Sequence, residues 1–156
     1  MPPEAPPFAN RDRTETVLAV SLSRADHDVL AALFERLPWK LTIAATLAEG
    51  IRYAMSERVR VVICEREWPG GNWQMLFDKI RELTHPPRLI VVSKVADESL
   101  WAEVLNLGGY DVLPTPFVAD EVHRVVSYAV DSWHLQVQSS PQRGQPTAAK
   151  GATELR

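Results

Sequence analysis

The chain has 156 residues, 46% of them hydrophobic, and a formal net charge of −3, which is typical of one globular domain. No hydrophobic stretch approaches the roughly 20 residues of a membrane span, and no block of lysine or arginine indicates a nucleic-acid partner, so we expect neither. The single cysteine, Cys64, excludes an internal disulfide and a cysteine-based zinc site, which favours a reducing compartment and a cytoplasmic protein.

Both ends of the chain have compositions typical of disorder. Residues 1–15 are rich in proline, and residues 135–156 are rich in serine, glutamine, proline, alanine and glycine. We therefore expect a disordered N-terminal tail over 1–15, one folded domain over 16–134 and a disordered C-terminal tail over 135–156. The C-terminal tail is too short for an output domain, so we expect a domain that acts alone.

Between the tails, short runs of β-branched and other hydrophobic residues alternate with stretches of helical spacing. This alternation predicts βα units and a parallel sheet. Most of the runs are continuously hydrophobic, as in strands that are covered on both faces. The predicted strands are Thr16–Ser21, Leu41–Ala45, Val59–Cys64, Arg88–Ser93 and Asp111–Leu113.

Helix boundaries follow from hydrophobic spacing and capping residues. Thr46 and Glu49 have the spacing of a capping box, and Asn72 can cap the third helix. Gly108-Gly109 ends the fourth helix, in which Leu100, Val104 and Leu107 are expected to point inward. The predicted helices cover residues 26–37, 46–58, 72–85, 97–107 and 119–133.

Five βα units with right-handed crossovers permit few arrangements. The commonest for one small domain is a flavodoxin-like, doubly wound three-layer sandwich with the parallel strand order 2-1-3-4-5. A functional site is then expected at the carboxyl ends of the strands, near the switch point between the first and third strands. The loops after Ser21, Glu65, Ser93 and Pro114 meet there.

Three segments at these strand ends resemble the receiver domain of two-component response regulators, the CheY-like family. They are Val61-Val-Ile-Cys-Glu65-Arg-Glu-Trp-Pro69-Gly-Gly, Leu89-Ile-Val-Val-Ser93 and Gly108-Gly-Tyr-Asp-Val-Leu-Pro-Thr-Pro116-Phe117. The resemblance covers residues 16–133. It implies a role in phosphorelay signal transduction.

The resemblance also assigns the family's functional positions to residues of this chain. A receiver transfers a phosphoryl group to its own aspartate with the help of Mg²⁺ and a lysine. Only the hydroxyl residue matches the family's usual choice. The phosphoacceptor position holds Glu65, the acidic pair Ser21 and Leu22, the switch hydroxyl Ser93, the lysine Thr115 and the switch aromatic Val112.

These replacements predict a degenerate receiver, or pseudo-receiver, that is not an enzyme. Leu22 and Ser21 lack the anionic oxygens that hold Mg²⁺, so we expect no cofactor and disfavour Mg²⁺. Thr115 lacks the positive charge of the lysine. Glu65 is one methylene longer than aspartate, and a misplacement of about 1 Å costs about a hundredfold in rate.

The residues around Glu65 leave several interpretations open. Glu65 could hold the domain in an activated-like state, or it could be an ordinary carboxylate without a signalling role. If the strand stays extended, Glu65 and Glu67 share one face as a weak cation site; otherwise they are two solvated carboxylates. Lys94 could reach Glu65 as an ion pair that replaces the missing lysine.

We expect the domain to act by contact with signalling proteins, such as a histidine kinase or an effector, or as a homodimer. The predicted interaction face contains Trp101, Val112 and Val118, because aromatic residues are enriched at interfaces and the family often docks partners there. Two alternatives remain. One is a small flavodoxin-like enzyme or ligand-binding protein, and the other is a receiver that is phosphorylated at unconventional residues, Ser21 or Ser93.

Overall fold

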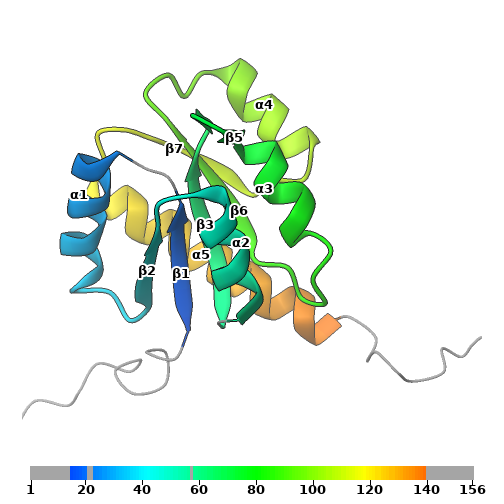
Figure 1. The fold of residues 1–156 in the computed structure, drawn as a ribbon. Helices are drawn as coiled ribbons and strands as arrows, with labels where there is room; N and C mark the ends of the chain where they lie inside the picture. Colours follow the sequence, from blue (N-terminus) through cyan, green and yellow to red (C-terminus); the bar gives the residue numbers. More distant parts are fainter. Residues whose placement is uncertain (1–14, 21–22, 57, 140–156) are drawn as a thin grey trace, which may run out of the picture.

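A parallel five-stranded sheet forms the middle layer of the computed structural model, which describes residues 15–20, 23–56 and 58–139 (Figure 1). The strand order is β2-β1-β3-β6-β7, and every neighbouring pair is parallel. Counted along the chain, the first to fifth strands of this sheet are β1, β2, β3, β6 and β7. The observed order is therefore the predicted order 2-1-3-4-5, which is confirmed. The five strands are β1 (Thr16–Val20), β2 (Lys40–Ala44), β3 (Val59–Glu65), β6 (Arg88–Ser93) and β7 (Asp111–Pro114).

Helices cover both faces of the sheet, which confirms the three-layer α/β architecture (Figure 1). α1 (Arg24–Phe34) and α5 (Ala119–Ser139) pack on one face. α2 (Leu47–Ser56), α3 (Trp73–Ile80) and α4 (Glu98–Asn106) pack on the other.

The central strand β3 supplies side chains to two separate hydrophobic cores. Val61 and Ile63 point toward α1 and α5, whereas Val62 and Cys64 point toward the other three helices. This alternation explains why the strand is hydrophobic without interruption. Burial raises the pKa of the free Cys64 thiol well above its ordinary value, so the thiol remains protonated inside the core.

The capping residues position the helices at the carboxyl edge of the sheet. Thr46 Oγ1 accepts a hydrogen bond from the amide of Glu49 (3.1 Å), while the Glu49 carboxylate accepts from the amide of Ala45 (2.8 Å). The capping box is therefore confirmed, except that the Glu49 carboxylate accepts from the amide of Ala45 rather than from the amide of Thr46, which the motif predicts. Asn72 caps α3 as predicted, and Ser23, which the spacing did not identify, caps α1.

The predicted strands agree with the structure to within one residue at each described end, but several helix predictions are wrong. α1 ends at Phe34 instead of Leu37, and α3 ends at Ile80 instead of His85, because the chain turns there. α5 continues to Ser139 instead of ending at Trp133, and in this added stretch His134 Nε2 lies 2.8 Å from the carboxylate of the buried Glu15. Leu107 is 49% exposed rather than inward, because α4 ends at Asn106 and the chain turns away there. The rest of the two predicted tails lies outside the described residues.

A short antiparallel hairpin, β4 (Glu67–Trp68) and β5 (Gly71–Asn72), follows directly after β3. Gly70 adopts a φ of 89°, which a turn after Pro69 requires and glycine accommodates. The hairpin lies at the carboxyl end of the sheet and leads into α3. In the described ranges, no helix is both long and hydrophobic enough to cross a membrane.

Candidate functional site

The carboxyl ends of β3, β6 and β7 bring three of the predicted site residues to one edge of the sheet. Glu65 is the last residue of β3 and pairs in register with Val92, next to Ser93 at the end of β6. Thr115 follows β7, and its amide donates to the carbonyl of Ser93 (3.2 Å). Ser21 and Leu22 lie outside the described residues.

Glu65 carries a half-buried carboxylate whose environment disfavours its charge. Burial raises the pKa of Glu65, and the nearby carboxylate of Asp26 raises it further. Lys94 and the backbone amide of Arg66 oppose this effect and lower it. The sequence analysis missed Asp26, which the first turn of α1 brings toward the end of β3; its position just after the β1–α1 loop was the available signal.

Lys94 does not form the expected ion pair with Glu65. Among the described residues, no Lys94 nitrogen lies within 4.0 Å of a Glu65 oxygen, and the lysine side chain is exposed. It acts on Glu65 only through its longer-range charge. The predicted replacement for the missing lysine is therefore wrong.

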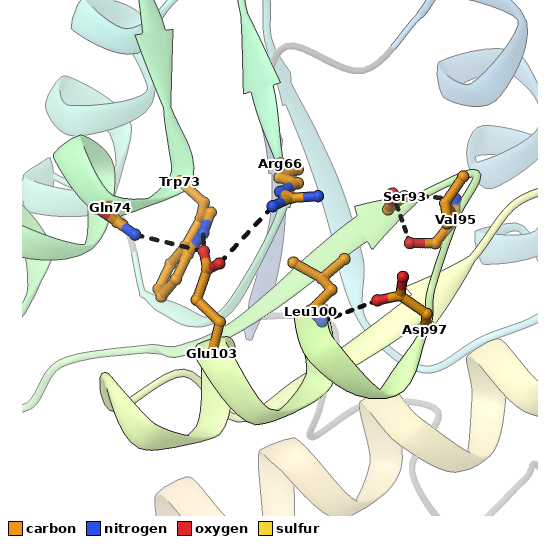
Figure 2. Close-up of polar contacts among 8 residues, drawn as sticks. All are labelled: Arg66, Trp73, Gln74, Ser93, Val95, Asp97, Leu100 and Glu103. Atoms are coloured by element: carbon orange, nitrogen blue, oxygen red, sulfur yellow. Dashed lines mark hydrogen bonds and ion pairs between the residues drawn. The ribbon is translucent and has the colours of Figure 1, made fainter.

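Ser93 uses its hydroxyl group within its own loop. The hydroxyl oxygen accepts a hydrogen bond from the amide of Val95 (3.1 Å) and lies 3.2 Å from the Val95 carbonyl, to which it donates (Figure 2). The side chain is largely buried. The only residue that matches the family's usual choice is thus engaged with local backbone rather than with Glu65.

The resemblance assigns Thr115 and Val112 to the lysine and aromatic positions, and neither side chain carries a positive charge or an aromatic ring. Thr115 is half-buried and precedes a cis peptide bond to Pro116. Val112 is only 8% exposed and contributes to the core. Its small exposed part lines a cavity beside Trp101, so Val112 contributes only a little area to the predicted interaction face.

The interpretation of Glu65 and Glu67 as a shared cation site rests on a strand that continues past Glu65, and this premise is wrong. The chain bends at Arg66 and enters the β4–β5 hairpin. Glu65 and Glu67 therefore do not share one strand face. In the part of the chain that the structure describes, no group of three or more histidine, cysteine, aspartate or glutamate side chains is placed to hold a metal ion.

A polar cluster connects the segment after Glu65 to α4. The Glu103 carboxylate lies 3.7 Å from the guanidinium of Arg66 and accepts hydrogen bonds from the side chains of Trp73 (3.3 Å) and Gln74 (3.4 Å). Figure 2 shows the three donors converging on this one side chain of α4. Sequence analysis missed the cluster, whose only signal was a tryptophan Nε1–H that needs an acceptor when buried.

The surface over α4, β7 and α5 is partly hydrophobic and hollowed. Trp101 is 51% exposed and Val118 57% exposed. Next to Trp101 lies a cavity of about 370 Å³, and its lining includes Asp97, Glu98, Trp101, Asp111, Glu121 and Arg124. We call these lining residues, together with Val118, the α4–β7–α5 face; its charge is mainly acidic.

A second, shallower depression of about 620 Å³ lies between α1, the end of β2 and the hairpin. Its lining includes Arg24, His27, Asp28, Ile43, Trp68 and Pro69. The mixed charge of this lining indicates no particular ligand.

Replacing Glu65 by glutamine is expected to stabilise the domain at pH 7 and to have little effect below the ordinary pKa of glutamate, about 4.3. A carboxyl group with a raised pKa in the folded state binds protons more readily there than in the unfolded state. Its contribution to stability is therefore present at low pH and is lost as the pH rises through the raised pKa.

Urea unfolding at several pH values measures this difference. Glu67→Gln, at an exposed position in β4, is the matched control and is expected to show a weaker pH dependence. A Glu65→Gln variant that is less stable than the wild type at pH 7 would contradict the prediction.

No protein-family model and no curated protein matches the sequence. Solved structures do match. The signal receiver domain of an HD domain-containing protein from Pseudomonas fluorescens Pf-5 is 22% identical, with a TM-score of 0.74 over 85% of this chain and 98% of that chain. A CheY-like response regulator receiver domain protein from Methanospirillum hungatei JF-1 is 20% identical, with a TM-score of 0.69 over 78% and 98%.

The receiver domain of the Francisella response regulator 1452 is similar as well, at 18% identity and a TM-score of 0.65 over 76% of this chain and 98% of that one. At such identities the likeness shows the fold. It covers nearly the whole length of each neighbour.

Proposed function

Because the chain has the fold of response regulator receiver domains, we propose that it is a degenerate receiver that acts by protein contact and without phosphorylation. The observation that carries the proposal is the chemistry of the strand-end site. Glu65 ends the central strand β3, at the position to which the resemblance assigns the phosphoacceptor aspartate. The hydroxyl of Ser93 is engaged by Val95, and Thr115 stands at the lysine position.

Phosphoryl transfer needs a well-placed nucleophile together with positive charge on the phosphoryl oxygens. Glu65 carries its carboxylate one methylene farther than an aspartate would, and Lys94, whose charge acts on Glu65, is exposed and forms no ion pair with it. Asp26 adds negative charge near Glu65, which repels an incoming phosphate donor. These features support phosphorylation-independent action.

Incubation with acetyl phosphate or beryllofluoride and Mg²⁺ tests the proposal. We expect an unchanged intact mass after acetyl phosphate and no amide NMR shifts around Glu65 with either reagent. A Mg²⁺-dependent beryllofluoride response or a stoichiometric phosphoadduct would instead support a receiver phosphorylated through unconventional residues. A nucleotide or flavin that copurifies with the protein would favour the ligand-binding alternative.

The α4–β7–α5 face is the surface that we assign to partner binding. The half-exposed indole of Trp101 offers a large hydrophobic contact, and the indole Nε1–H donates to Asp111 (3.3 Å), which orients the ring. Asp97, Glu98 and Glu121 surround it with negative charge. Such a face fits a signalling protein that presents hydrophobic and basic residues.

Trp101→Ala is expected to weaken partner capture by about 30-fold, since removal of an aromatic hot spot costs about 2 kcal/mol. The measurement is capture of a kinase or effector by the tagged full chain, followed by titration of the purified pair. Met55→Ala on α2, whose side chain is 68% exposed, is the matched control. An equal loss of partner affinity in Trp101→Ala and Met55→Ala, or no loss in either variant, would contradict the assignment of this face to partner binding.

A further inference from the structure

We infer that Glu103 is a positioning residue that joins the segment after Glu65 to α4, so that a change at Glu65 reaches the α4–β7–α5 face through Arg66 and Glu103. This inference rests on the proposed function, because it concerns how the strand-end site and the partner face communicate. It assigns a role to the polar cluster, which the proposed function leaves without one.

The first step of the connection is the rigid placement of Arg66. Its amide donates to the carbonyl of Val92 on β6 (3.1 Å), and its carbonyl accepts from the amide of Trp73 at the start of α3 (3.0 Å). The same residue follows Glu65 directly in the chain. The backbone of Arg66 is thus held by β6 and α3 at the position next to Glu65.

The second step is the contact of Arg66 and its neighbours with α4. One Glu103 oxygen lies 3.7 Å from Arg66 Nη2, and the other accepts from Trp73 Nε1 and Gln74 Nε2. Figure 2 shows that Arg66 and Trp73 reach this carboxylate from different sides. Since the Trp73 side chain is only 1% exposed, one of these donors is fixed by the core.

The third step is the transmission along α4. Leu100 and Val104 anchor this helix in the core, and Asp97 caps its start through the amide of Leu100 (2.9 Å). Trp101, two residues from Glu103, extends to the partner face. Glu103 and Trp101 lie on the same anchored helix, so a change in the contacts of Glu103 reaches Trp101 through the α4 backbone.

Receivers usually connect the phosphorylation site to the partner face through a hydroxyl residue and an aromatic residue. This connection is incomplete in this chain, so a second connection between the two regions is relevant. The Ser93 hydroxyl is bound to Val95, and Val112 has no aromatic ring to reorient. By contrast, the contact between Arg66 and Glu103 links the same two regions directly. Because both side chains of this ion pair are partly exposed, the pair can break and re-form.

A double-mutant cycle observed by NMR tests the inference on the full chain. Glu65→Gln is introduced into the wild type and into Glu103→Ala, and the readout is the displacement of the Trp101 indole Nε1–H signal. We expect Glu65→Gln to displace this signal in the wild type and to leave it unmoved in the Glu103→Ala background. The matched control is Asn106→Ala on the same helix, an exposed position outside the α4–β7–α5 face, in which the displacement should persist.

Glu103→Gln provides a second variant that keeps the shape of the side chain and removes its charge. It is expected to reduce the displacement, and it keeps the test valid if Glu103→Ala does not fold. An equal displacement in the wild type and both Glu103 variants, or no displacement in the wild type, would overturn the inference. A phosphoadduct or an unaffected partner interaction would instead contradict the proposed function, so the two failures are distinguishable.

Discussion

Replacement of Arg60 by alanine is expected to lower the free energy of unfolding by about 3–5 kcal/mol, as is typical when one partner of a buried ion pair is removed. Arg60 Nε lies 2.8 Å from Glu15 Oε2, and the two side chains are 11% and 7% exposed. Without the guanidinium, the Glu15 carboxylate loses its most buried partner. His134, the other partner, is partly exposed.

The same substitution also removes a contact with the final helix. The guanidinium carbon of Arg60 lies 3.9 Å from the centre of the Trp133 ring, a cation–π geometry. Arg60 takes this position where the register between β1 and β3 shifts. The effect of the substitution should therefore include fraying of α5 beyond Trp133.

Urea unfolding at pH 7 measures the loss, and hydrogen exchange in α5 locates it. The control is the double variant Glu15→Gln, Arg60→Met, which removes both charges and is expected to recover most of the lost stability. A loss below about 1 kcal/mol for Arg60→Ala would place the pair among surface ion pairs and contradict the prediction.

Replacement of Trp73 by alanine is expected to cost about 3–5 kcal/mol, the range for removal of a large aromatic side chain from a core. Trp73 is 1% exposed and lies in the core between the sheet and α2, α3 and α4. Its ring packs near Phe77, with 6.1 Å between ring centres. No other side chain can fill the space without moving the helices.

Trp101→Ala is the matched comparison, because the same atoms are removed from a ring that is 51% exposed. Its cost is expected to be about 1 kcal/mol or less. Thermal and urea unfolding of both variants check the difference. Similar losses in the two variants would show that Trp101 also supports the fold, and the partner experiment would then require a smaller substitution.

The position of the candidate site could be predicted because it depends on local sequence alone. Glu65, Ser93 and Thr115 each follow a hydrophobic run, and the ends of parallel strands meet at one edge of the sheet. The surroundings of the site could not be predicted in this way. Asp26 and Lys94 influence Glu65 from other elements, and the orientation of their side chains depends on packing.

The sequence by itself determined the βα alternation, the strand bounds and the strand order, because hydrophobic period and crossover handedness are local or nearly local constraints. Only the tertiary structure decided that Val112 is buried, that the Ser93 hydroxyl is occupied and that Glu103 meets Arg66. It also decided that α5 runs to Ser139, where the polar composition predicted a tail. Each of these features depends on contacts between distant residues, whose geometry exists only once the helices have packed on the sheet.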